Sequence, residues 1–152
     1  NFIFKLGEER KAPLSSLNTV KNWLKKAPPT ANQAGRENVY TLCFALGLNA
    51  KEAKEFFLKA YLERPFNYKN IHEAVYFFCM NNGLAYPDAK AIIEEVEALP
   101  ETENADAEQV TEQIGYAISL IDNKDVLIKY IASNRCGFSL QNKKFLRSAK
   151  KY

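Results

Sequence analysis

The sequence predicts an all-α protein, a multi-helix bundle, on three observations. Apolar residues recur at spacings of three and four over most of the chain, which is the period of a helix with one buried face. Helix-capping residues and glycines punctuate these segments where helices begin and end. No two segments show the alternating pattern of paired strands. With 152 residues, the chain is long enough to bury a core without a disulfide or a metal.

Eight helices are expected along the chain. A segment at 2–6 ahead of them is either a short strand or an extended arm, and a Pro-rich loop from Pro28 to Gly35 separates the first helix from the second. The expected helices span about 15–26, 36–46, 50–64, 71–81, 87–99, 110–121, 124–131 and 139–149. The last three form a C-terminal three-helix segment.

Asparagine side chains mark three of these helix starts. Asn49 with Glu52, and Asn70 with Glu73, have the three-residue spacing of a capping box, in which each residue bonds the backbone N–H of the other. Asn123 can cap the helix that follows it. These caps predict where the helices begin from local chemistry alone.

The most apolar helix and the most acidic segment together predict the domain organisation. The helix at 71–81 is apolar almost all round, which is typical of a helix in the middle of a fold. A helical domain is therefore expected at 1–100. An acidic linker follows at 101–108, and C-terminal helices at 109–152 are expected to pack on the first part.

An internal repeat lies at an offset of 36 residues. Residues 37–54 align without gaps on 73–90, with identical residues at eight of the eighteen positions. Gly47 aligns with Gly83, and glycine in this position ends a helix in the left-handed conformation. Two copies are fewer than the three or so that a free-standing helical solenoid needs, so flanking helices would have to cap the pair.

The repeat predicts two tandem helix-turn-helix hairpins, at 36–64 and 72–99, packed as a pseudo-symmetric pair. The same spacing fits a DNA-binding helix-turn-helix, whose second helix enters the groove. That helix is neutral in the first hairpin and acidic in the second. Its charged residues are Lys51, Glu52, Lys54 and Glu55 in the first, and Asp88, Lys90, Glu94 and Glu95 in the second. Phosphate contact needs a basic surface, so structural packing is the favoured interpretation and DNA binding is the alternative.

Three motifs point to a known family. They are Arg36-x-x-Val39-x-x-Leu42-Cys43-Phe44-Ala45-Leu46-Gly47-Leu48, then Glu52-Ala53, then Glu73-Ala74-Val75 with Asn82-Gly83-Leu84. Through them, residues 36–90 resemble the helical segment that follows the DNA-binding part of bacterial XRE-type (lambda-repressor-like) helix-turn-helix regulators. Ahead of Arg36 the sequence departs from that family, since one expected helix around Trp23 and a Pro-rich loop replace a full helix-turn-helix. The resemblance implies a bacterial, helical, regulatory protein and carries over no DNA-contacting residue.

Charge is unevenly distributed along the chain. Residues 91–123 hold nine acidic residues and no basic ones, whereas the rest holds all 21 Lys and Arg. Candidate contacts for nucleic acid or an acidic partner are Lys21, Trp23, Lys25, Lys26, Lys143, Lys144, Arg147, Lys150 and Lys151. Two other interpretations stay open: solvated helix faces, or an acidic stretch that binds the basic tail within the chain.

Catalytic and metal-binding patterns are not found in the sequence. His72 is the single histidine, in the first turn of a helix and without a sequence-local nucleophile. Cys43, Cys79 and Cys136 are widely spaced, as expected of reduced thiols and not of a disulfide framework or a zinc site. No phosphate-binding loop or dinucleotide fingerprint occurs. We therefore expect a protein that is not an enzyme and has neither cofactor nor metal.

The location expected from the sequence is the cytoplasm. No apolar run approaches the roughly 20 residues that span a bilayer, and no membrane partner is expected. No signal-peptide pattern opens the sequence, which begins at Asn1 and not at Met.

Two functions follow from these patterns. The first is a non-catalytic helical regulatory or protein-interaction module of a bacterial intracellular protein. Aromatic residues in or near the inter-hairpin loops would be its anchors where they are exposed, and otherwise pack the core: Tyr61, Phe66, Tyr68 and Tyr86. The alternative is a nucleic-acid-binding transcriptional regulator of helix-turn-helix type. A protein partner is expected in the first case, and the oligomeric state is not predicted.

Overall fold

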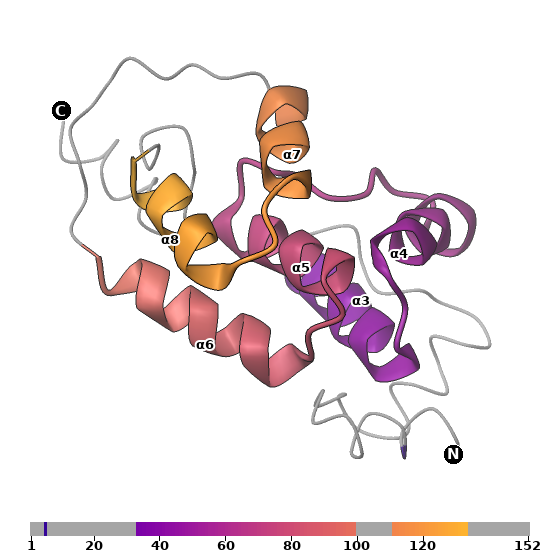
Figure 1. The fold of residues 1–152 in the computed structure, drawn as a ribbon. Coiled ribbons are helices and arrows are strands. Elements are labelled where there is room, and N and C mark those ends of the chain that lie inside the picture. The colour runs from indigo at the N-terminus through magenta and orange to yellow at the C-terminus, as the bar shows by residue number, and fades with distance from the viewer. Residues whose placement is uncertain (1–4, 6–32, 100–110, 134–152) are drawn as a thin grey trace, which may run out of the picture. The chain divides into compact units, whose positions relative to one another are not determined.

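A computed structural model describes Lys5, residues 33–99 and residues 111–133 of the chain (Figure 1). Within these residues there are six α-helices, one short π-helix and no strand, so the all-α class is confirmed for the described part. The helices expected at 15–26 and 139–149, and the acidic linker at 101–108, lie outside the described residues.

The helices follow one another with short connections. They are α3 (Gln33–Leu46), α4 (Ala50–Phe56), the π-helix η1 (Phe57–Tyr61), α5 (Ile71–Asn81), α6 (Tyr86–Glu97), α7 (Thr111–Ser119) and α8 (Lys124–Ser133). Asn123 Oδ1 accepts hydrogen bonds from the backbone N–H groups of Asp125, at 2.8 Å, and Val126, at 3.4 Å, which confirms the predicted cap of α8.

Several helix ends differ by about two residues from the sequence expectation, since α6 ends at Glu97, α7 ends at Ser119 and α8 continues to Ser133. Two differences are larger. Gly35 was expected in a loop, but it is a buried residue in the first turn of α3, because tertiary burial outweighs the low helix propensity of glycine. The helix after Asn49 was expected to be a single α-helix, but it continues as a π-helix from Phe57 and ends at Leu62, whose φ is 59°. A π turn has one more residue than an α turn, which the apolar spacing of a single turn does not encode.

The chain divides into two compact units, each built from segments that are distant in sequence. Unit 1 comprises Asn1–Pro65 and Cys79–Ala89, and unit 2 comprises Phe66–Phe78 and Lys90–Tyr152. The chain passes from one unit to the other within α5 and again within α6.

The core of unit 1 is rich in aromatic rings. The ring centroids of Tyr40 and Phe57 are 4.7 Å apart, and Phe57 meets Tyr61 edge to face at 5.5 Å. The Arg36 guanidinium lies over the Phe57 ring, 5.2 Å from its centroid, and donates to the backbone carbonyl of Arg64 at 2.9 Å. This arginine therefore joins α3 to the chain that leaves η1.

The core of unit 2 combines aliphatic residues of four helices with an aromatic loop. Its buried aliphatic residues are Ile71, Val75, Ile92, Ile93, Val96, Ile114, Ile118, Leu127 and Ile131. In the loop, Phe66 stacks on Tyr68 with ring centroids 6.1 Å apart, and both rings meet Phe77 edge to face.

The second predicted cap, at the start of α5, is confirmed in part. Asn70 Oδ1 accepts a hydrogen bond from Glu73 N at 3.1 Å, as expected. The Glu73 carboxylate, which is only 1% exposed, accepts a hydrogen bond from Asn67 N at 2.8 Å. Glu73 therefore anchors the loop before α5 as well as the helix itself.

Candidate functional site

A pocket of about 260 Å³ opens in unit 1, where the turn after α3 and the turn after α5 both contribute to its wall. The residues that line it are Phe44, Gly47, Leu48, Asn49, Met80, Gly83, Leu84, Ala85 and Tyr86, and none is charged. Small-molecule sites usually measure about 300–1,000 Å³. The pocket therefore lies just below the usual size of a small-molecule site.

The two turns at this pocket have the same local geometry. Gly47 and Gly83 both have φ of 70°, a left-handed conformation that glycine adopts without strain. Leu48 N donates to the carbonyl of Cys43 at 3.0 Å, and Leu84 N donates to that of Cys79 at 2.8 Å. Such hydrogen bonds close a helix in a Schellman motif and turn the following leucine inward. The similarity is local, and the packing of the hairpins as a symmetric repeat stays a prediction.

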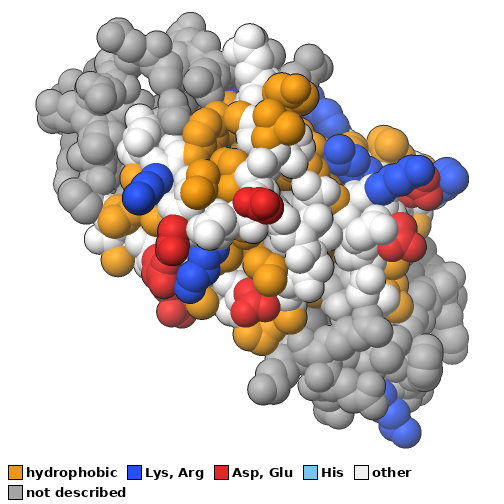
Figure 2. Space-filling model, in the orientation of Figure 1, with side chains coloured by type: hydrophobic (Ala, Val, Ile, Leu, Met, Phe, Trp, Pro, Cys, Tyr) orange, Lys and Arg blue, Asp and Glu red, His pale blue; other side chains and the backbone are white. Residues whose placement is uncertain are grey.

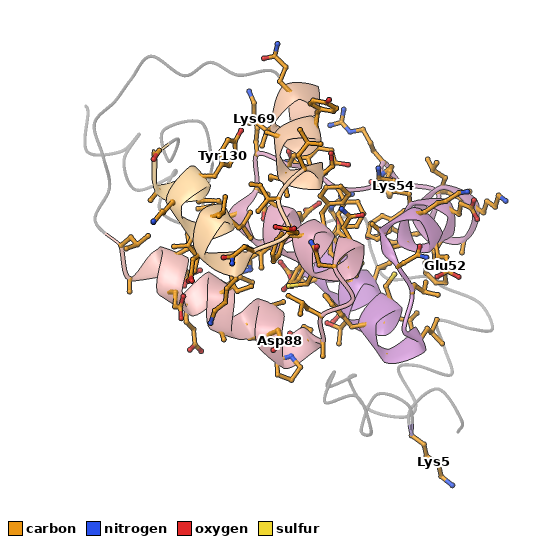
Figure 3. The ribbon with its side chains drawn as sticks, in the orientation of Figure 1. Lys5, Glu52, Lys54, Lys69, Asp88 and Tyr130 are labelled. Atoms are coloured by element: carbon orange, nitrogen blue, oxygen red, sulfur yellow. The ribbon has the colours of Figure 1, made fainter. Side chains whose placement is uncertain are left out.

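Each turn leads into a helix whose first turn is held by a carboxylate. Glu52 N donates to Asn49 Oδ1 at 2.8 Å and Asn49 N donates to Glu52 Oε1 at 3.0 Å, which confirms the predicted capping box. At the start of α6, Ala85 N donates to Asp88 Oδ2 at 2.9 Å. Figure 3 shows Glu52 on α4 and Asp88 on α6, both exposed. Two carboxylates thus accept hydrogen bonds from the backbone of residues that line the pocket.

Tyr86 is the one predicted anchor that lines the pocket. Its ring meets the buried Phe44 ring edge to face, with centroids 5.6 Å apart, and its side chain is half-buried. Tyr61 and Phe66 are buried, at 5% and 4% exposure, so they pack the core and offer no exposed ring. Tyr68 is half-buried in the aromatic loop of unit 2.

The sequence reasoning missed the aliphatic wall of the pocket. Leu48 and Leu84, and likewise Phe44 and Met80, occupy positions related by the 36-residue offset. The repeat alignment had already matched the two leucines, which directly follow the two helix-ending glycines. A leucine directly after each helix-ending glycine is therefore the sequence feature from which a shared pocket could have been predicted.

The nine candidate contacts for nucleic acid or an acidic partner, and Cys136, lie outside the described residues. Cys43 and Cys79 are free and buried, as predicted. Burial raises the pKa of the Cys43 thiol to about 12, and burial together with the charge of Asp88 raises that of Cys79 to about 12. A thiolate is the reactive form of cysteine, so these two thiols are poor nucleophiles.

In unit 2, the His72 side chain pairs with a carboxylate. Its Nε2 lies 2.9 Å from Glu97 Oε1, so that the first turn of α5 is joined to the last turn of α6. Over residues 33–99 and 111–133, no group of three or more His, Cys, Asp or Glu side chains has the arrangement of a metal site. None of the described helices is long and apolar enough to cross a bilayer.

Large hydrophobic side chains outside the pocket lining are also exposed, and Figure 2 shows areas of hydrophobic side chains on one face of the molecule. Leu58 and Leu62 belong to unit 1, and Tyr116, Leu120 and Val126 belong to unit 2. Single exposed apolar residues are common on protein surfaces. They are therefore not assigned to a site.

No family model matches the chain, and its comparison with curated proteins and with solved structures finds no significant match. The resemblance of residues 36–90 to helix-turn-helix regulators therefore stays a prediction.

Proposed function

We propose that this protein is a non-catalytic helical interaction module whose pocket in unit 1 receives an apolar side chain of a partner protein. The observation that carries this proposal is the uncharged pocket of about 260 Å³ between two glycine-ended helix turns. Aromatic and aliphatic pockets of this kind hold the anchor residues that dominate protein interfaces. Helix ends held by hydrogen bonds also keep the wall in place before a partner arrives, which lowers the entropy cost of binding.

The chemistry of the lining favours binding over catalysis. Among the lining residues only the Tyr86 phenol and the Asn49 amide have polar side chains apart from the thioether of Met80. General acid–base or nucleophilic catalysis needs a titratable group poised near neutral pH beside the reacting atoms. The lining contains no such group.

The internal repeat adds a role for the two hairpins. In this proposal each hairpin contributes one turn, with Gly47-Leu48 from the first and Gly83-Leu84 from the second. A partner side chain in the pocket would contact both turns at once and stabilise their packing. This coupling between binding and hairpin packing is how a regulatory module would respond to its partner.

The alternative function, a transcriptional regulator that binds nucleic acid, has less support from the described residues. A groove-entering helix needs basic residues for phosphate contact. The helix α6 has the acidic residues Asp88, Glu94, Glu95 and Glu97 and the single basic residue Lys90. Fluorescence anisotropy with mixed-sequence duplex and single-stranded nucleic acid at low and high salt tests this alternative. Submicromolar binding that weakens steeply with salt would establish it in place of the pocket.

A variant that fills the pocket tests the main proposal. Ala85 is exposed and lines the pocket, so Ala85→Trp would place an indole there without removing a core side chain. Ala60→Trp is the matched control, because Ala60 is exposed on η1 and does not line the pocket. Random peptides displayed on phage are selected on the full wild-type chain and then measured on both variants.

The expected result is that selected peptides bind Ala85→Trp about tenfold or more weakly, as for the loss of one anchor contact, and bind Ala60→Trp as they bind wild type. Circular dichroism of both variants checks that each remains helical. The proposal fails if no peptide is selected, or if the selected peptides bind Ala85→Trp as tightly as wild type.

A further inference from the structure

Two carboxylates flank the pocket and have acceptor capacity left for a partner. Glu52 uses Oε1 for the N–H of Asn49, and Asp88 uses Oδ2 for the N–H of Ala85. An ionised carboxylate has two oxygens and about four acceptor positions. Both side chains are exposed, so the second oxygen of each is within reach of a cation in solution.

The positions of these carboxylates are set by the helix starts that they stabilise. Glu52 is one half of a reciprocal capping box, and Asp88 bonds the backbone of the residue before α6. The partial positive charge of a helix N-terminus also favours a carboxylate there. A partner cation would therefore meet negative charges that lose little freedom when it binds.

These carboxylates place negative charge next to the pocket. The lining itself is uncharged, and the lysines of the same two helices, Lys51, Lys54 and Lys90, do not line it. Glu52 and Asp88 are each hydrogen-bonded to the backbone of a lining residue. Two carboxylates are thus held beside residues that line an uncharged pocket.

We infer that the partner segment presents a Lys or Arg side chain next to the apolar side chain that enters the pocket. This inference rests on the proposed function and names the chemistry of the partner. The apolar side chain fills the cavity, and the cation pairs with Glu52 or Asp88 at the rim. Rim charges act mostly on association and on its salt dependence, so the cation selects among partners more than it adds affinity.

Three synthetic dodecapeptide libraries test the inference. Each has Phe at its centre, and the positions on either side of Phe are Lys in the first library, Ser in the second and Glu in the third. The amount of peptide retained by the immobilised full chain is measured at low and high salt. The variant is Glu52→Gln with Asp88→Asn, in which an amide oxygen still accepts the backbone N–H. The matched control is Glu55→Gln with Glu95→Gln, which neutralises exposed carboxylates farther along the same helices.

The Lys library is expected to be retained about fivefold more than the Ser library at low salt, and the Glu library least, as for one or two exposed ion pairs. This preference should fall towards unity at high salt and in the Glu52→Gln, Asp88→Asn variant, and persist in the control. Equal retention of the three libraries, or a Lys preference that survives in the variant, would overturn the inference.

The Ala85→Trp variant separates this inference from the proposed function. If all three libraries are retained equally on wild type and all are lost on Ala85→Trp, the pocket binds apolar side chains and only the charge inference fails. If no library is retained, or if Ala85→Trp retains them as wild type does, the proposed function fails and the inference fails with it.

Discussion

The α7 residue Gly115 lies so close to the Tyr68 ring that a side chain at position 115 would clash with it. A Cβ atom built on Gly115 would lie 2.5 Å from Cε2 of Tyr68. The Tyr68 ring stacks on Phe66 and meets Phe77 edge to face, so it has neighbours on other sides as well. The absence of a side chain at Gly115 is therefore what allows α7 to pack on the aromatic loop of unit 2.

Gly115→Ala is expected to destabilise the protein by about 1–3 kcal/mol, the usual cost of overpacking a core, despite the higher helix propensity of alanine. Denaturant unfolding followed by circular dichroism measures the change. In the Tyr68→Leu background the contact is relieved, so Gly115→Ala should then cost much less. Equal costs in the two backgrounds would show that the close approach is not the cause.

Glu73→Ala is expected to lower the free energy of unfolding by about 1–3 kcal/mol, because it leaves the Asn67 N–H without its carboxylate acceptor. Glu73→Gln retains an acceptor oxygen at the same place and should cost less than Glu73→Ala. The measurement is again denaturant unfolding. A larger loss for Glu73→Gln than for Glu73→Ala would contradict this role of the carboxylate.

Asn123→Ala is expected to cost about 1 kcal/mol, because the side chain accepts hydrogen bonds from the first turn of α8. Asn123→Asp keeps an acceptor and adds a negative charge at the helix N-terminus, so it should be close to neutral or stabilising. The melting temperatures of the two variants provide the comparison. Similar losses in both would mean that the hydrogen-bond acceptor of Asn123 is not the source of the stabilisation.

Burial of Cys43 and Cys79 predicts a loss of stability at alkaline pH. An unfolded thiol has a pKa of about 9.0, whereas burial raises the pKa of both thiols to about 12. Above pH 9.0 the unfolded chain therefore binds fewer protons than the folded one. The contribution of the neutral thiols is complete below that pH and decreases as the pH rises towards 12.

The matching experiment compares wild type with the Cys43→Ala, Cys79→Ala variant by denaturant unfolding across this range of pH. Wild type should lose stability more steeply with pH than the variant, because only wild type has the two buried thiols. Tyrosines and lysines titrate in both proteins, so their effect cancels in the comparison. Native alkylation of the two thiols should also be slow until the chain unfolds. Parallel pH profiles, or rapid alkylation of Cys43 or Cys79 in the folded chain, would contradict the effect of burial.

Substitutions of Tyr86 test whether the pocket binds the partner. Tyr86→Ala removes the ring that meets Phe44 and is expected to weaken peptide binding about tenfold or more. Tyr86→Phe keeps the ring and should retain most of the affinity. Binding is measured by anisotropy with the peptides selected on wild type. If Tyr86→Ala binds them as wild type does, this ring does not contribute to the site.

Several features of the fold were predictable because they depend on residues a few positions apart. The ends of α5 at Ile71 and Asn81 and the glycine stop after α3 agree with the sequence expectation. A capping box spans four residues and a Schellman turn six, so short stretches of sequence contain the chemistry that forms them.

The environments of the four candidate aromatic anchors could not be predicted from the local sequence. Tyr61, Phe66, Tyr68 and Tyr86 all occur in or near the expected loops, yet two are buried, one packs in the loop of unit 2 and one lines the pocket. Aromatic side chains favour cores and interfaces alike, since both remove apolar surface from water. Only the surroundings of each ring in three dimensions distinguish these roles.

The sequence by itself determined the helical class, the helix caps and the glycine-ended turns, because each depends on hydrogen bonds within one or two helical turns. The tertiary structure alone decided the pocket, the π turn after α4 and the contact of Glu73 with Asn67. It also brought Leu48 and Leu84, which are 36 residues apart, to the wall of one cavity. The physical reason is that packing depends on the shapes of segments distant in the chain, which a periodic pattern does not specify.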